Sequence, residues 1–174
     1  TIRGGSTPIT EKIVARLPVT FELGLIAILV GLLISLPIGI LSAIRQDSFG
    51  DYVARGLAIL FISIPSFWMA TVVMVYPALW WGWSPPMEYI YFTEDPLGNL
   101  GQFIIPASVL GLLMAGVVMR MTRSMMLEVL RQDYIRTAWA KGLKERMVIL
   151  RHALKNALIP VVTVIGVMLP TVVG

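Results

Sequence analysis

The sequence contains no cysteine, a single histidine and few charged residues. Lys, Arg, Asp and Glu make up 14% of the chain, against about 25% in a typical soluble domain. Without cysteine, no disulfide framework, thiolate metal site or cysteine nucleophile can form, and one histidine excludes a histidine-rich metal site. The hydrophobic share is 57% and the mean hydropathy is +0.82. Both departures from the soluble average predict a protein whose solvent is lipid.

Signatures of other protein classes are absent as well. The sequence has no G-x-x-x-x-G-K-[ST] phosphate-binding loop, so we do not expect this chain to bind ATP in the usual way. It also shows no cluster of candidate acid, base and nucleophile that would indicate an enzyme. The chain begins at Thr1 without a signal-peptide pattern and ends at Gly174 inside an apolar run. We therefore expect an internal piece of a longer protein, with further spans on both sides.

Long apolar runs take the place of the missing charge. A helix needs about 20 mostly apolar residues to cross the roughly 30 Å hydrocarbon core of a bilayer. Residues 23–44 carry no charge, and none occurs between Arg55 and Glu88. Prolines inside these runs, Pro65 among them, remove backbone donors and are expected to kink the helices. The sequence predicts four spans, the last incomplete, near residues 20–44, 56–79, 103–126 and 157–174.

The basic residues are concentrated on one side of the predicted spans. Residues 120–155 contain nine Lys or Arg against three Asp or Glu, whereas residues 80–102 contain three acids and no basic residue. By the positive-inside rule, the first segment is cytoplasmic and the second faces outward. The short link 45–55 then lies inside, and residues 1–17 lie outside despite their three basic side chains.

The segment 133–160 is too polar to cross lipid and too regular to be a loose loop. Apolar residues recur at helical spacing in its first half, and Gly142 is expected to end that helix as a cap or sharp turn. A second apolar helical face runs directly into the fourth span. The pattern predicts a cytoplasmic helix–turn–helix that presents small residues around Ala138, Ala140 and Gly142, with basic flanks that complement an acidic partner. A side chain at Gly142 is expected to collide with the turn or with that partner.

This segment resembles the EAA loop of ABC importer permeases, in which Glu-Ala-Ala is followed three residues later by Gly. Aligned on Gly142, the triplet reads Arg136-Thr137-Ala138, and the later Leu-Pro of the loop reads Leu154-Lys155. These replacements look like the peptide/nickel-type permeases, in which Tyr-Ile-Arg-Thr-Ala-x-Ala-Lys-Gly-Leu and Arg-His-Ala-Leu-x-Asn-Ala-Leu-Ile-Pro are characteristic. Three further motifs are similar to that subfamily: Arg16-Leu17-Pro18-x-Thr20, Pro37-x-Gly39 and Ser63-Ile64-Pro65-x-Phe67-Trp68.

The resemblance covers nearly the whole chain and implies an all-α, polytopic transmembrane helical bundle like that of type I ABC importer permeases. Residues 1–174 would form one transmembrane permease domain, with a cytoplasmic coupling region over residues 127–156. By resemblance, residues 134–143 form a coupling helix that docks into a groove on a separate ATPase. The residues implied in this coupling are Tyr134, Ile135, Arg136, Thr137, Ala138, Ala140, Lys141, Gly142 and Leu143.

The same resemblance implies the partners and the location. Such permeases work in pairs in the bacterial inner membrane, which they cross several times, with two ATPase subunits inside and a solute-binding protein outside. We expect a related chain as the second permease subunit, contact with membrane lipid, and no nucleic acid partner. The chain itself is expected to hold no catalytic residue, metal or cofactor, because ATP is bound by the partner subunits.

The sequence leaves more than one cargo and more than one energy source open. Permeases of this type carry short peptides, nickel complexes or glutathione, and peptide is the default by frequency. An ion-gradient-driven transporter or channel is the alternative, and it predicts paired ionisable groups inside the spans. Only Glu22, near the edge of the first span, approaches that description, and we interpret it as a solvated residue. His152 is interpreted as a surface or packing residue.

Overall fold

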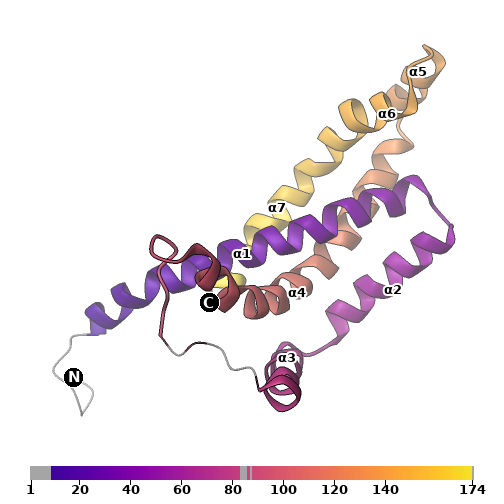
Figure 1. The fold of residues 1–174 in the computed structure, drawn as a ribbon. Coiled ribbons are helices and arrows are strands. Elements are labelled where there is room, and N and C mark those ends of the chain that lie inside the picture. The colour runs from indigo at the N-terminus through magenta and orange to yellow at the C-terminus, as the bar shows by residue number, and fades with distance from the viewer. Residues whose placement is uncertain (1–8, 83–85, 87, 174) are drawn as a thin grey trace.

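The computed structural model describes residues 9–82, 86 and 88–173, and every regular element in this part of the chain is helical. The elements are α1 (Ile9–Ile44), α2 (Phe49–Ser63), α3 (Ser66–Trp81), α4 (Pro96–Leu130), α5 (Asp133–Ala140), α6 (Glu145–Met147), the π-helix η1 (Val148–Ala153) and α7 (Leu154–Val173). As Figure 1 shows, α6, η1 and α7 form one continuous helical rod. The predicted all-α, polytopic fold is confirmed, since three stretches of the described residues are long and apolar enough to cross a bilayer: Arg16–Ile44, Pro96–Leu130 and Glu145–Met168.

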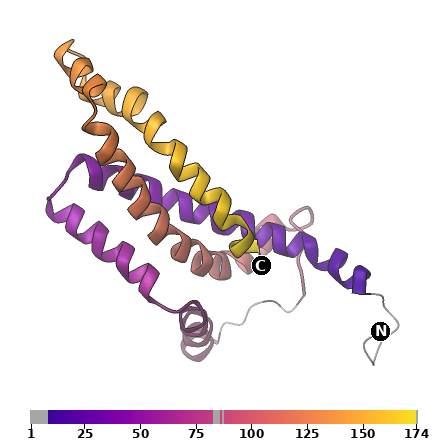
Figure 2. The same cartoon turned by 180° about the vertical axis from the view of Figure 1, so that it is seen from behind.

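The centre of the bundle is the contact between α1 and α4, which lie side by side in Figures 1 and 2. A Cβ atom on Gly111 of α4 would lie 2.7 Å from the Ala27 carbonyl oxygen of α1, so only glycine permits this approach of the two backbones. Because lipid tails are as apolar as leucine, helices in a bilayer associate through such close packing. On α1, a small buried residue recurs at every fourth position along this contact: Ala27, Gly31, Ser35, Gly39 and Ala43.

The segment 56–79, predicted as one span, is bent. α2 ends at Ser63 and α3 begins at Ser66, and the two helices are bent by 94° relative to each other. Pro65 has no N–H to continue the hydrogen bonds of α2, and Ile64 before it is extended (φ −78°, ψ 124°). Figure 2 shows α3 turned away from the direction of α2. The expected kink at Pro65 is present, and the bent pair counted as one span would bring the number of spans to four.

The connection between α3 and α4, predicted to face outward, is tied to α1 and α4. The Tyr89 hydroxyl donates to the Glu22 carboxylate over 2.7 Å, and the Asn99 side-chain amide donates to the Ile90 carbonyl over 2.8 Å. The hydrogen bond to Glu22, together with burial, raises the pKa of Tyr89 to about 12, as expected for a phenol that donates to a carboxylate. Glu22 is therefore a half-buried anchor of this connection, which corrects its interpretation as a solvated residue.

Candidate functional site

α5 lies at one end of the bundle, beyond the link between α1 and α2, where α4 and the α6–α7 rod come together (Figure 1). Arg131 and Gln132 separate it from α4, and residues 141–144 separate it from α6. The predicted helix–turn–helix is therefore present, and its second helix continues into α7.

One face of α5 is buried. Ile135 is fully buried and Ala138 is 8% exposed, and both belong to a cluster with Met126, Val148 and Ile149. An isolated helix of eight residues is not stable in water, so this packing is what holds α5 in place. Of the remaining residues predicted for coupling, Leu143 is half-buried and packs against this core, and the others are exposed: Tyr134, Arg136, Thr137, Ala140, Lys141 and Gly142.

Ala138 differs from its expected place. It was predicted on the small exposed surface with Ala140 and Gly142, but it faces the core because it follows Ile135 by three residues and shares that helix face. Ala140 and Gly142 are exposed as expected. The accessible small surface of α5 therefore consists of its C-terminal end.

Gly142 ends α5, as predicted. Its φ of +75° is left-handed, a conformation that glycine adopts without steric cost. The Gly142 N–H donates to the Trp139 carbonyl over 2.9 Å, and the Leu143 N–H donates to the Ala138 carbonyl over 3.4 Å. These two bonds form a Schellman motif, and Leu143 supplies the hydrophobic contact that accompanies it by packing on the cluster that holds Ala138.

The space beside Gly142 is open. A Cβ atom there would meet no atom of the described residues within 4 Å. A side chain would therefore not collide with the turn, which corrects that part of the expectation. What remains is backbone strain of about 1–2 kcal/mol for most residues in the left-handed region, and a collision with any partner that uses this space.

A hydrogen bond joins α5 directly to α7. Asn156 Nδ2 donates to the Tyr134 hydroxyl oxygen over 2.8 Å and to the His152 carbonyl oxygen over 3.1 Å. η1 lies between the two helices. In this π-helix the Leu154 N–H donates a hydrogen bond to the Ile149 carbonyl, five residues earlier. Single π-turns inside helices occur frequently at functional sites. α5 is thus connected to α7 by packing against η1 and by the Tyr134–Asn156 bond.

A polar cluster that the sequence analysis did not predict joins α1, α2 and α4. The side chain of Asp51 in α2 is fully buried, and Arg123 of α4 donates to it through Nε over 2.7 Å and through Nη2 over 2.8 Å. Ser42 of α1 and the Asp47 backbone N–H also donate to this carboxylate. A bidentate arginine and additional hydrogen bonds are what a buried carboxylate needs to remain charged.

Part of this cluster has a signal in the sequence. Ser48-x-x-Asp51 ahead of an apolar run is the pattern of a helix start, and the Ser48 hydroxyl accepts from the Asp51 N–H over 3.3 Å. No local pattern connects Asp51 with Arg123, which lies 72 positions further along the chain. Among the residues that the structure describes, no group of three or more His, Asp or Glu side chains could hold a metal ion.

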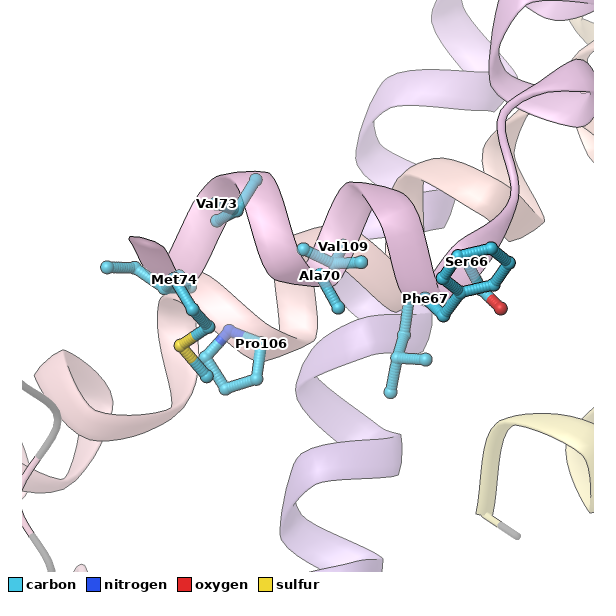
Figure 3. A pocket seen from close by; sticks show the side chains of 9 residues that line it. Ser66, Phe67, Ala70, Val73, Met74, Pro106 and Val109 are labelled. Carbon is cyan, nitrogen blue, oxygen red and sulfur yellow. The ribbon is translucent and has the colours of Figure 1, made fainter. Parts of the chain in front are cut away.

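A cavity of about 340 Å³ lies between α3 and α4 (Figure 3). Phe67 and Met74 of α3 and Pro106 and Val109 of α4 line it. The Ser66 hydroxyl is the only polar side chain among the described residues of this lining. Charged or strongly polar solutes need hydrogen-bonding partners when they leave water, so we do not assign this cavity as a solute site.

The apolar spans, the close helix contacts and the packed helix–turn–helix define a polytopic membrane protein with a short helix fixed at one end of its bundle. The family model of the binding-protein-dependent transport system inner membrane component matches residues 35–174. The chain belongs to this family.

Three similar proteins align with nearly the whole of this chain. A putative peptide transport system permease protein of Brucella suis is 42% identical over 169 residues, which are 97% of this chain and 54% of the relative. The oligopeptide transport system permease protein AppB of Bacillus subtilis is 42% identical over 171 residues, 97% of this chain and 54% of the relative. The dipeptide transport system permease protein DppB of Escherichia coli is 39% identical over 190 residues, which cover 96% of this chain and 56% of the relative. The chain spans about half the length of the curated relatives it matches.

Proposed function

We propose that this chain is the membrane-spanning permease part of an ATP-driven importer of short peptides. The observation that carries the proposal is α5, a short helix that is held by packing on one face, exposed on the other and joined to both α4 and α7. The printed names of the relatives, which are peptide, dipeptide and oligopeptide permeases, support peptide as the cargo. The present sequence has no phosphate-binding loop, and in this proposal a separate ATPase supplies the energy.

The charge pattern supports a cytoplasmic position for α5 in a bacterial inner membrane. The nine basic residues between 120 and 155 lie on its side of the bundle, and the acidic connection between α3 and α4 lies on the other. Lys141 and Lys144, exposed beside the turn, suit an acidic rim on the ATPase.

The exposed end of α5 has the composition of a docking surface. Ala140 and Gly142 are small and accessible, so a partner's backbone can approach closely there. Tyr134 and Trp139, each 44% exposed, flank this surface. Aromatic residues of this kind are enriched among the residues that contribute most to protein–protein affinity.

The contacts of α5 provide a route from the ATPase to the spans. When closure of the ATPase pair displaces α5, the cluster around Ile135 moves η1 and α4, and the Tyr134–Asn156 bond moves α7. α4 is in turn locked to α1 by close backbone packing at Gly111 and to α2 by the Arg123–Asp51 pair. Packed helices of this kind move as rigid bodies, which suits the change between inward-facing and outward-facing states.

Two further partners complete the proposal. A second permease subunit, a related chain, supplies the other wall of the solute path, and a solute-binding protein delivers peptide on the outer side. The large apolar side chains exposed on α1 and α3 suit contact with membrane lipid or with that second subunit, among them Leu33, Phe67 and Trp81.

Reconstitution tests this function against a gradient-driven transporter. The full-length protein and its partner subunits would be placed in liposomes, and uptake of a labelled dipeptide would be measured. We expect uptake to require ATP on the side of the ATPase subunits and to persist when an ionophore collapses ion gradients. Uptake that follows an imposed ion gradient and is indifferent to ATP would contradict the proposal.

A further inference from the structure

A second cavity, of about 250 Å³, lies where α1, α2 and α4 meet, next to the buried pair of Asp51 and Arg123. No acidic residue lines it among the described residues, and the polar side chains of its lining carry guanidinium or hydroxyl groups. A site with this composition selects for an anion because arginine supplies only hydrogen-bond donors and a permanent positive charge. The polar lining consists of Ser42, Arg55, Arg120, Arg123 and Ser124.

Only one of the three arginines is fully paired. Arg123 is held by its two bonds to Asp51. Arg55 Nη2 lies 3.6 Å from Asp51 and 4.0 Å from Asp47, which are ion-pair distances too long for hydrogen bonds. The Nε and Nη2 atoms of Arg55 are buried and have no hydrogen-bond partner among the described residues. Arg120 makes no ion pair or hydrogen bond through its side chain within the same part of the chain.

Arg55 lies in two long ion pairs and over the ring of Tyr52, but its buried Nε and Nη2 atoms make no hydrogen bond and call for an acceptor. A buried donor without a partner costs about 1–3 kcal/mol, and more when the group is charged. A phosphate group matches this need, since its oxygens accept the two parallel N–H bonds that a guanidinium donates. An anion between Arg55 and the exposed Arg120 would accept hydrogen bonds from both side chains while the Asp51–Arg123 pair remains intact.

The rest of the lining distinguishes a lipid from a free anion. Ala58, Ile59 and Met119 form an apolar wall, and Ile59 is 61% exposed on the outer surface of α2. A free phosphate gains nothing from such a wall, whereas the glycerol and acyl groups of a phospholipid do. In the proposed topology the cavity lies near the cytoplasmic link 45–55, and basic pockets between membrane helices on that side recognise anionic headgroups.

We propose that this cavity binds the phosphate group of an anionic phospholipid from the cytoplasmic leaflet, with Arg55 and Arg120 as its ligands. The bound lipid fills the space between α2 and α4 on the membrane-facing side. The inference uses the topology of the proposed function but does not depend on the ATPase or on the cargo.

Native mass spectrometry of the full-length protein tests this site. The protein would be released from detergent after incubation with phosphatidylglycerol, phosphatidylcholine or inorganic phosphate. Arg120→Gln removes a ligand that makes no ion pair with Asp51, and Arg55→Gln removes the other ligand together with its long ion pairs to Asp51 and Asp47. Arg146→Gln, at an exposed position of α6, is the matched control for a lost charge. We expect one phosphatidylglycerol on the wild-type and control proteins, and at least about fivefold weaker binding in each cavity variant.

Equal phosphatidylglycerol binding by all four proteins would overturn the proposal, as would equal binding of phosphatidylcholine. Inorganic phosphate bound without either lipid would assign the site to a free anion and overturn the lipid source. Because the readout is bound mass and not uptake, a protein that binds the lipid but fails to import peptide would contradict the proposed function and leave this site standing.

Discussion

Gly142 was predictable as a helix cap from the sequence, and the structure shows why a glycine stands there. Its position after a short amphipathic segment predicts a helix cap, and the left-handed φ of +75° and the Schellman bonds confirm that prediction. The open space beside it has no signal in the sequence, because it depends on how the following residues turn. Ala138 shows the opposite case: its small size suggested an exposed contact, and its helix face places it in the core.

Gly142→Asp is expected to abolish uptake while the protein still inserts into the membrane. The added side chain points into open space in this chain, so its effect arises where the ATPase would approach. Uptake of labelled dipeptide and the amount of protein in purified membranes measure the two parts of this prediction.

Gly82→Asp is the matched control for that experiment. Gly82 also has a left-handed φ, +64°, and no described residue lies within 4 Å of its Cβ position, but it ends α3 on the side of the bundle away from α5. Both substitutions carry the same backbone strain of about 1–2 kcal/mol, so only a docking role separates them. Normal uptake by Gly142→Asp would show that α5 does not dock through this surface.

At the level of helices, the sequence predicts where helices form but not the angles at which they pack. Apolar runs and their lengths indicate where helices form, and Pro65 indicates where one breaks. The 94° angle between α2 and α3 depends on packing against α4, which no local pattern encodes. The π-turn of η1 lies where Val148 and Ile149 pack in one cluster with residues of α5 and α4.

The contact between α1 and α4 is expected to tolerate no added atom at Gly111. Gly111→Ala places a methyl group against the Ala27 carbonyl oxygen, and overpacking of this kind costs about 1–3 kcal/mol. Gly101→Ala, on the same helix with no described residue within 4 Å of its Cβ position, is expected to leave stability unchanged or raise it by up to about 1 kcal/mol. Thermal unfolding in detergent measures both, and equal midpoints would contradict the close backbone contact.

The bond between α5 and α7 is expected to matter for coupling more than for assembly. Tyr134→Phe removes the hydroxyl that Asn156 donates to, and a hydrogen bond of this kind contributes about 0.5–1.5 kcal/mol. We expect the peptide imported per ATP hydrolysed to fall by about two- to tenfold. Thr163→Val, which removes a hydroxyl bonded only within α7, should leave this ratio unchanged. A Tyr134→Phe protein with the wild-type ratio would exclude this bond from the route.

At the level of the whole molecule, sequence and structure contribute different knowledge. Composition and charge placement predict a membrane protein, its number of helical runs and the side on which α5 lies. The packing that turns these runs into one body comes from residues far apart in the chain, such as Asp51 with Arg123 and Ala27 with Gly111. Such pairs leave no local periodicity, so only the structure could identify them.

Cysteine crosslinking from α5 tests the central claim, that this helix docks on an ATPase. Ala140→Cys, at an exposed position, would be compared in membranes with Ala138→Cys, which lies two residues away and is buried. This part of the protein has no native cysteine to compete. We predict that Ala140→Cys crosslinks to an ATPase subunit with a yield that changes on addition of ATP, and that Ala138→Cys does not crosslink. The absence of any crosslink from Ala140→Cys in correctly inserted protein would contradict the account.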